Sequence, residues 1–122
     1  KMKRILIVDD SPTMLMSMEG VLKRNGYDVE TATSAKQAIF KAPLFKPDMM
    51  ITDLNMPEMN GIDLIKELKQ TSIMRFKPIM MLTIESQQDK RDEAKQAGAT
   101  GWLVKPVQPD ELSNVVRKLL PL

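Results

Sequence analysis

Short apolar runs alternate along the chain with segments whose apolar residues recur at helical spacing. A continuous apolar run of this length, bounded by turn signals, is typical of a strand that is buried on both faces. The second run is more polar than the others, which predicts a place at the edge of the sheet. The predicted strands cover residues 5–8, 27–32, 49–52, 78–82 and 102–104.

A helical pattern follows each predicted strand. Proline next to a capping residue, and serine with glutamine three positions on, are typical helix starts. The predicted helices run from Pro12 to just before Gly26, from the capping box Ser34/Gln37 to an end bounded by Pro43 and Pro47, around Ile62 to Leu68, over residues 86–97, and from Pro109 through Leu119.

The helix predicted over residues 86–97 has a thin apolar face that consists only of Ala94 and Ala97. Few buried apolar contacts mean a low local stability. We therefore expect this helix to be held loosely and to offer a surface to a partner.

Five strand–helix units in succession predict an α/β fold with a parallel sheet that is covered on both faces. In such sheets, ligands bind beyond the carboxyl ends of the strands. The 122 residues are enough for one domain with a core, and too few for two ordinary domains. We see no segment that could span a bilayer and no signal peptide.

The composition removes several kinds of chemistry. The chain has no cysteine and no histidine, which excludes disulfides, thiolate sites, imidazole ligands and the usual hydrolase triads. Its 18 basic and 16 acidic residues are interspersed, and a net charge of +2 does not indicate a nucleic-acid surface. Carboxylate, hydroxyl and lysine groups remain as candidates.

Polar residues end four of the predicted strands. Asp9 and Asp10 follow the first, Asp53 the third, Thr83 the fourth and Lys105 the fifth. In a parallel sheet these ends share one edge, so the side chains should converge. Three adjacent carboxylates repel one another, and a single lysine does not neutralise them. Oxygen ligands of this kind favour a hard divalent ion such as Mg²⁺, Mn²⁺ or Ca²⁺.

A metal beside an aspartate predicts phosphoryl transfer to that aspartate, with the lysine and the hydroxyl stabilising charge on the moving oxygens. Each residue alone has a simpler interpretation. Asp9 and Asp10 could be acids at a helix start, Asp53 a turn residue and Lys105 a solvated charge. Their joint placement at the strand ends favours the site.

The order of the motifs along the chain resembles the receiver domain of two-component response regulators. The match covers essentially the whole chain, which we interpret as one receiver domain over residues 1–122. It implies a flavodoxin-like, doubly wound (βα)5 fold with strand order 2-1-3-4-5, most similar to the stand-alone chemotaxis regulators. The motifs are Val8-Asp9-Asp10, Asp53-Leu54-Asn55-Met56-Pro57-Glu58-Met59-Asn60-Gly61, Leu82-Thr83, Gly98-Ala99-Thr100-Gly101-Trp102 and Lys105-Pro106.

The resemblance also assigns roles. Asp53 is the implied phosphoacceptor, and Mg²⁺, or Mn²⁺ in its place, is implied at Asp9, Asp10, Asp53 and the backbone carbonyl of Asn55. Thr83 and Lys105 are implied to contact the phosphoryl group. The remaining implied features are a switch formed by Thr83 with Trp102 and a cis peptide bond at Lys105-Pro106. Without the resemblance, Trp102 is simply a core residue.

Three positions flank the expected site. Asn55 and Glu85 occupy positions that tune dephosphorylation in the family. Ile84 departs from the family, which usually has a small residue there. We expect this β-branched side chain to slow phosphorylation by small donors, slow attack by water or limit inward rotation of Trp102.

The implied function is a cytoplasmic signalling switch rather than an enzyme acting on external substrates. Its implied partners are a sensor histidine kinase, an output target such as a flagellar motor switch component, and a phosphatase; no nucleic acid or membrane partner is expected. The alternatives are a phosphorelay intermediate, a receiver cut from a larger regulator, a Mg²⁺-dependent phosphohydrolase and a phosphate-independent pseudo-receiver.

Overall fold

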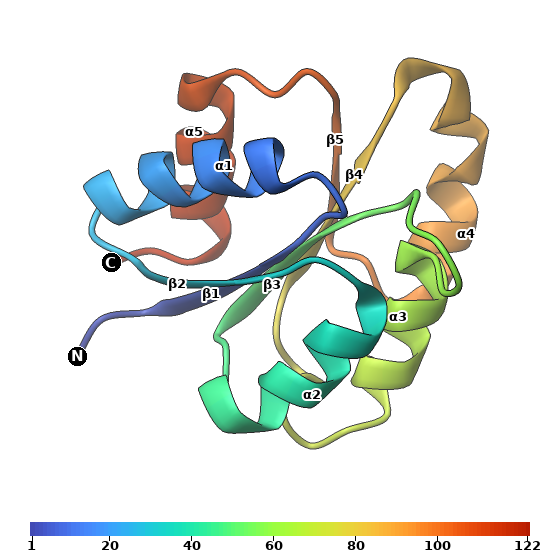
Figure 1. Cartoon of the computed structure of the whole chain (residues 1–122), viewed down its shortest axis with the longest axis horizontal. Helices are drawn as coiled ribbons and strands as arrows, with labels where there is room; N and C mark the ends of the chain where they lie inside the picture. The colour runs from blue at the N-terminus through green and yellow to red at the C-terminus, as the bar shows by residue number, and fades with distance from the viewer.

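Five parallel strands form one sheet with helices on both faces (Figure 1). The computed structural model describes residues 1–122 apart from the side chain of Glu85. The elements are β1 (Arg4–Val8), α1 (Pro12–Arg24), β2 (Asp28–Ala32), α2 (Ala35–Phe45), β3 (Met49–Asp53), α3 (Gly61–Lys69), β4 (Ile79–Thr83), the 3₁₀ helix η1 (Glu85–Lys90), α4 (Arg91–Ala97), β5 (Gly101–Val104) and α5 (Pro109–Leu119).

The strand order is β2-β1-β3-β4-β5, and all neighbouring strands are parallel. The expected order and the edge position of the second strand are both confirmed. Helices α1 and α5 cover one face of the sheet, and α2, α3 and α4 cover the other (Figure 1). The carboxyl ends of β1, β3, β4 and β5 therefore meet at one edge.

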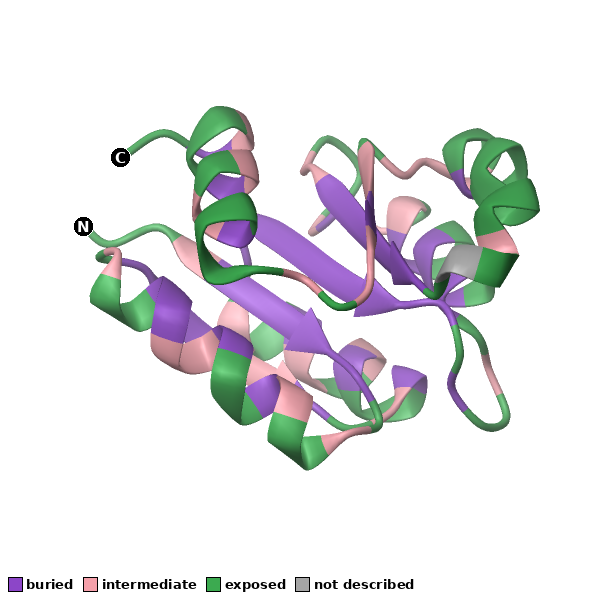
Figure 2. Cartoon of the chain, turned by 90° about the horizontal axis from the view of Figure 1, so that it is seen from above, coloured by how far each residue is buried: buried purple, intermediate pink, exposed green. Residues whose placement is uncertain are grey.

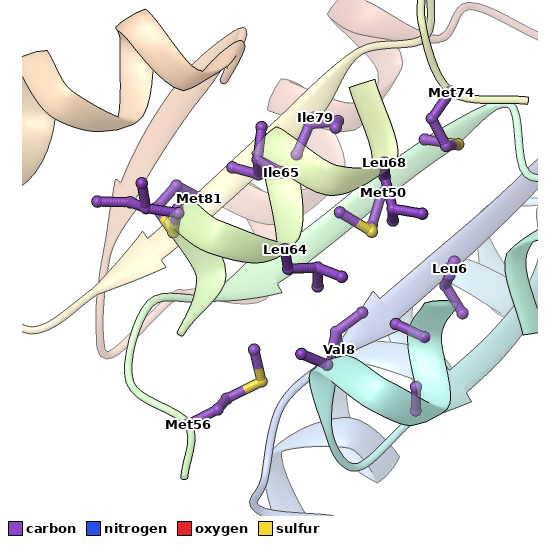
Figure 3. Packing of buried hydrophobic residues seen from close by; sticks show 14 of the residues in the cluster. Leu6, Val8, Met50, Met56, Leu64, Ile65, Leu68, Met74, Ile79 and Met81 are labelled. Atoms are coloured by element: carbon purple, nitrogen blue, oxygen red, sulfur yellow. The ribbon is translucent and has the colours of Figure 1, made fainter. Parts of the chain in front are cut away.

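The three central strands are buried on both sides (Figure 2). Successive side chains alternate between two cores, because neighbouring residues of a strand point to opposite faces. In β1, Ile5 and Ile7 pack toward α1 and α5, while Leu6 and Val8 pack toward α2 and α3. Methionines fill much of the core between the sheet and the helices α2, α3 and α4. There, Met50 and Met81 lie among leucine and isoleucine side chains (Figure 3).

The helix α2 ends at Phe45, between Pro43 and Pro47 as predicted, and it continues through Pro43. A proline inside a helix removes only one backbone hydrogen bond, and the N–H of Lys46 still donates to the carbonyl of Ala42 at 2.8 Å. The guanidinium of Arg4 also donates to the carbonyl of Phe45 at 2.9 Å, which ties the last turn to β1.

The segment predicted as one helix over residues 86–97 is instead η1 followed by the short α4. Gln87 has non-helical backbone angles (φ −113°, ψ 20°), and neither element has a side-chain N-cap. Ala94 is the buried residue of α4, as the sequence pattern predicted. Burial of a single alanine does not supply enough apolar contact to enforce a continuous α-helix.

The helices that the structure describes are all too short or too polar to cross a bilayer.

Candidate functional site

The end of β1 places two aspartates in different environments. Asp9 is fully buried, and its Oδ1 accepts a hydrogen bond from the backbone N–H of Ser11 at 2.9 Å. Ser11 is the N-cap of α1 and accepts from the N–H of Met14 at 3.3 Å. Asp10 remains exposed. The strand-to-helix turn thus fixes one carboxylate inside the site and leaves the other at its mouth.

The loop after β3 holds Asp53, which is only 4% exposed. The backbone N–H of Asn55, two positions on, favours the charged form of the Asp53 carboxylate. The loop then returns to the strand, because the N–H of Gly61 donates to the carbonyl of Leu54 at 2.9 Å. A Cβ at Gly61 would collide with the backbone oxygen of Asp53, so this close approach requires glycine. Met56 packs into the core and anchors the loop.

The ends of β4 and β5 complete the cleft. Thr83 is fully buried, and its Oγ1 has no hydrogen-bond partner among the described residues. Lys105 lies between the two buried carboxylates: its Nζ is 2.9 Å from Oδ2 of Asp9 and 3.3 Å from Oδ1 of Asp53. Its backbone N–H donates to the carbonyl of Thr83 at 2.7 Å. The Lys105-Pro106 peptide bond is cis, as the resemblance implied.

The cleft holds more negative than positive charge. Burial and the nearby charge of Asp9 raise the pKa of the Asp53 carboxyl, and Lys105 only partly counteracts them. Burial lowers the pKa of the Lys105 ammonium, but its hydrogen bond to Asp9 and the charge of Asp53 together hold this pKa above its ordinary value. Lys105 therefore stays charged, and the site retains excess negative charge.

The donor set fits a hard cation. Asp9, Asp10 and Asp53 each offer a carboxylate oxygen, and these oxygens lie within 4.8 Å of one another. Asp10 lines a shallow depression together with Asn55, Met56, Pro57 and Asn60. An all-oxygen set beside an open depression matches the preference of Mg²⁺ for carboxylates combined with water and phosphate oxygens.

Thr83 and Trp102 lie on the same face of the sheet. In the register of β4 and β5, Thr83 pairs with Val104, and Met81 pairs with Trp102. Trp102 therefore lies diagonally across from Thr83, two residues before Val104. Trp102 is partly buried against the core beneath α3 and α4, and its buried Nε1 has no partner among the described side chains. The proposed switch residues are therefore neighbours.

Ile84, Glu85 and Asn55 are the positions predicted to flank the site. Ile84 directly follows Thr83 and is 47% exposed. The side chain of Glu85 lies outside the described residues. The sequence analysis missed Gln87, whose side-chain amide pairs with that of Asn55. It stands in a polar segment without periodicity, so no signal in the sequence singled it out.

Comparisons with known proteins agree with this geometry. The family model described as "Response regulator receiver domain" matches residues 5–117. The chemotaxis protein CheY of Thermotoga maritima is 40% identical across 96% of this chain and 97% of its own length. The transcriptional regulator PhoP of Bacillus subtilis is 35% identical across 97% of this chain, which spans about half (48%) of PhoP.

Solved structures give the same result. CheY4 of Vibrio cholerae superposes with a TM-score of 0.94 at 40% identity, covering 98% of this chain and all (100%) of that one. The receiver domain of the sensor histidine kinase PA1611 from Pseudomonas aeruginosa has a TM-score of 0.87 at 28% identity, covering 98% of each chain. The PA1611 structure contains a magnesium ion coordinated in its active-site cleft.

Proposed function

Because the chain belongs to the response regulator receiver domain family, we propose that it is a signalling switch that is activated by phosphorylation of Asp53. The observation that carries this proposal is the partly buried Lys105 ammonium between Asp9 and Asp53, next to Thr83, whose hydroxyl has no partner among the described residues. This arrangement is better suited to binding a phosphoryl group than to stabilising the fold as an ion pair. The whole chain, residues 1–122, acts as the receiver.

The proposed reaction moves one phosphoryl group. A carboxylate oxygen of Asp53 attacks the phosphorus of a phosphohistidine on a partner kinase. The P–N bond breaks as the P–O bond forms, and the imidazole leaves with the electron pair and takes up a proton. Attack by water on the same phosphorus later returns the free carboxylate and inorganic phosphate. The protein thus turns over its own phosphate and acts on no external substrate.

The proposed metal ligands are the carboxylates of Asp9, Asp10 and Asp53 with the backbone carbonyl of Asn55. Mg²⁺, or Mn²⁺ in its place, supplies neutralisation of charge on the transferring phosphoryl oxygens when it is bound. The geometry of the three carboxylates and the magnesium ion in the PA1611 receiver support this assignment.

Two other side chains act on the phosphoryl group. Lys105 provides a positive charge, because its hydrogen bond to Asp9 and the charge of Asp53 keep the ammonium protonated despite its burial. Thr83 offers a hydroxyl that gains a partner when a phosphoryl oxygen arrives, because it has none among the described residues. An inward shift of Thr83 leaves space that Trp102 can fill, and the surface formed by α4, β5 and α5 changes for an output target.

The proposed partners follow from the relatives. A sensor histidine kinase supplies the phosphoryl group in the cytoplasm, and a phosphatase shortens the signal. The similarity to CheY over nearly the full length of both chains favours an output target such as a flagellar motor switch component. The similarity to PhoP supports a second candidate function, in which this receiver is part of a larger regulator and controls it. A further alternative is a phosphorelay intermediate that passes the phosphoryl group on.

The test is intact mass after incubation with acetyl phosphate, with and without Mg²⁺. We expect a gain of one phosphoryl group that requires Mg²⁺ and is lost in Asp53→Asn. Asp63→Asn, which removes an exposed acid at the start of α3, is the matched control and should still be phosphorylated.

Three results would contradict the proposal. Phosphorylation of Asp53→Asn would place the acceptor elsewhere. A parent protein that gains no phosphoryl group and binds no Mg²⁺, measured by calorimetry, would be a pseudo-receiver. Turnover of an external phosphate ester would instead favour the phosphohydrolase.

A further inference from the structure

The side-chain amides of Asn55, in the loop after β3, and of Gln87, in η1, form a reciprocal pair. Nε2 of Gln87 donates to Oδ1 of Asn55 at 2.7 Å, and Nδ2 of Asn55 donates to Oε1 of Gln87. The partners are 32 positions apart in the chain. Each amide therefore uses one donor and one acceptor on the other, which fixes the orientation of both side chains.

The pair connects η1 to the phosphoacceptor loop. Asn55 lies two positions after Asp53, and its backbone N–H favours the charged form of that carboxylate, so Gln87 is linked to Asp53 through a single residue. The pair also lines a hollow of about 110 Å³ that opens beside the site, together with Leu54, Asn60, Ile62, Lys90 and Glu93. A change at Gln87 is thus transmitted to the rim of the cleft.

Among the described side chains, this pair supplies the hydrogen bonds that join η1 to the loop after β3. The segment has no side-chain N-cap, and Gln87 itself interrupts the helical backbone geometry. Gln87 is partly buried, while its neighbour Gln88 is exposed. Because Thr83 lies four residues before Gln87, a shift of Thr83 toward a phosphoryl group would pull on this pair.

We propose that Asn55 and Gln87 form an amide latch that partly closes the rim of the cleft and sets how fast water and small phosphoryl donors reach Asp53. This role rests on the proposed function of Asp53. Gln87 is a positioning residue, since it contacts Asn55 and not the reacting atoms. When the latch is closed, η1 lies against the phosphoacceptor loop and access is restricted. When it opens, η1 is free to move with Thr83.

The effect should be moderate. Neutral hydrogen bonds near the surface contribute little each, so the closed state is favoured only weakly. Loss of both bonds should raise the access-limited rates by about two- to fivefold. Substitution of Asp53 should abolish phosphorylation altogether.

The experiment compares Gln87→Ala with Gln88→Ala, which removes the same side chain from the neighbouring exposed position. Each protein is phosphorylated with acetyl phosphate and Mg²⁺, then freed of donor, and the phosphoryl group is followed by intact mass. We expect phosphorylation and hydrolysis both to be about two- to fivefold faster in Gln87→Ala and unchanged in Gln88→Ala. Thermal unfolding should be similar for all three proteins.

A double-mutant cycle tests whether the two amides act together. If they do, Asn55→Ala and Gln87→Ala should have non-additive effects on the hydrolysis rate. Independently of phosphorylation, the side-chain NH₂ resonances of Asn55 in a ¹⁵N spectrum should shift in Gln87→Ala and stay in place in Gln88→Ala.

The outcomes separate the two proposals. If the parent is phosphorylated but Gln87→Ala and Gln88→Ala share its rates, the latch is wrong and the switch stands. Unmoved Asn55 amide resonances in Gln87→Ala also refute the latch. If the parent accepts no phosphoryl group and binds no Mg²⁺, the proposed function fails, and the role of the latch in access fails with it.

Discussion

At the scale of single residues, the site consists of side chains whose roles depend on their burial. Asp9 and Asp53 are buried carboxylates, whereas Asp10 beside them is exposed. The sequence shows the residue types and their places at the strand ends, and topology then brings them together. It does not show which of two adjacent aspartates turns inward, because that depends on the hydrogen bond from Ser11 to Asp9.

Ile84 is the residue at which this site departs most visibly from its family, and it gives a prediction of its own. Its side chain is 47% exposed directly after Thr83. Removing the branched side chain in Ile84→Ala should widen the approach to Asp53. We expect faster phosphorylation by acetyl phosphate and faster hydrolysis, each by a few-fold, with little change in stability because the site is exposed.

The control for Ile84 is Ile84→Val, which keeps the branch at Cβ and should retain nearly the parental rates. Equal rates for Ile84→Ala and the parent would show that this side chain does not limit access. The remaining idea, that Ile84 restricts Trp102, would then need a structure of the phosphorylated protein.

At the scale of secondary-structure elements, the apolar pattern predicts the strands and the starts of the helices well. The pattern also bounds the end of α2 between Pro43 and Pro47, but it does not identify the last residue. The helix passes Pro43 and ends at Phe45, where a contact from Arg4 and the cap at Lys46 hold its last turn. Pattern reasoning fails where packing decides the outcome. For example, η1 departs from a regular helix where too few apolar residues are available for packing.

The end of α2 carries a second prediction. Lys46 has left-handed backbone angles (φ 54°, ψ 64°), which cost free energy for any residue with a Cβ and little for glycine. Lys46→Gly should therefore raise the free energy of unfolding by about 0.5–1 kcal/mol, measured by denaturant titration. The matched control is Lys66→Gly at an exposed position inside α3, which should lower it by about 1 kcal/mol. A loss of stability in Lys46→Gly would show that the lysine side chain contributes more than its backbone strain costs.

At the scale of the whole molecule, the fold brings together acidic side chains whose negative charge Lys105 only partly neutralises. The parallel topology directs the ends of β1, β3, β4 and β5 to one edge, which is why the site was predictable from strand ends. The Asn55–Gln87 pair was not predictable, because it joins two irregular segments whose paths follow from packing. The same convergence of acids should reduce global stability when no cation is bound.

This cost gives the last prediction. Burial, and then the charge of Asp9, raise the pKa of the Asp53 carboxyl in the folded protein. The ionised carboxylate is therefore less favourable in the folded than in the unfolded chain. Asp53→Asn should be more stable than the parent at neutral pH without metal, by roughly 1 kcal/mol, since Lys105 keeps Asp9 as a partner.

The dependence on pH follows from the sign of this shift. Below the ordinary aspartate pKa of about 4, Asp53 is protonated in both states and the advantage of Asp53→Asn should vanish. The advantage of Asp53→Asn should appear as the pH rises through that value and be complete above the raised pKa of the folded protein.

Mg²⁺ should stabilise the parent more than Asp53→Asn, because binding to the folded state adds to the free energy of unfolding. Urea titrations of both proteins at several pH values, with and without Mg²⁺, measure all of these differences, with Asp63→Asn as the control that gains no such stability. A constant difference between parent and Asp53→Asn at every pH would mean that the charge of Asp53 is not its cause, and an equal response to Mg²⁺ would mean that the ion binds elsewhere.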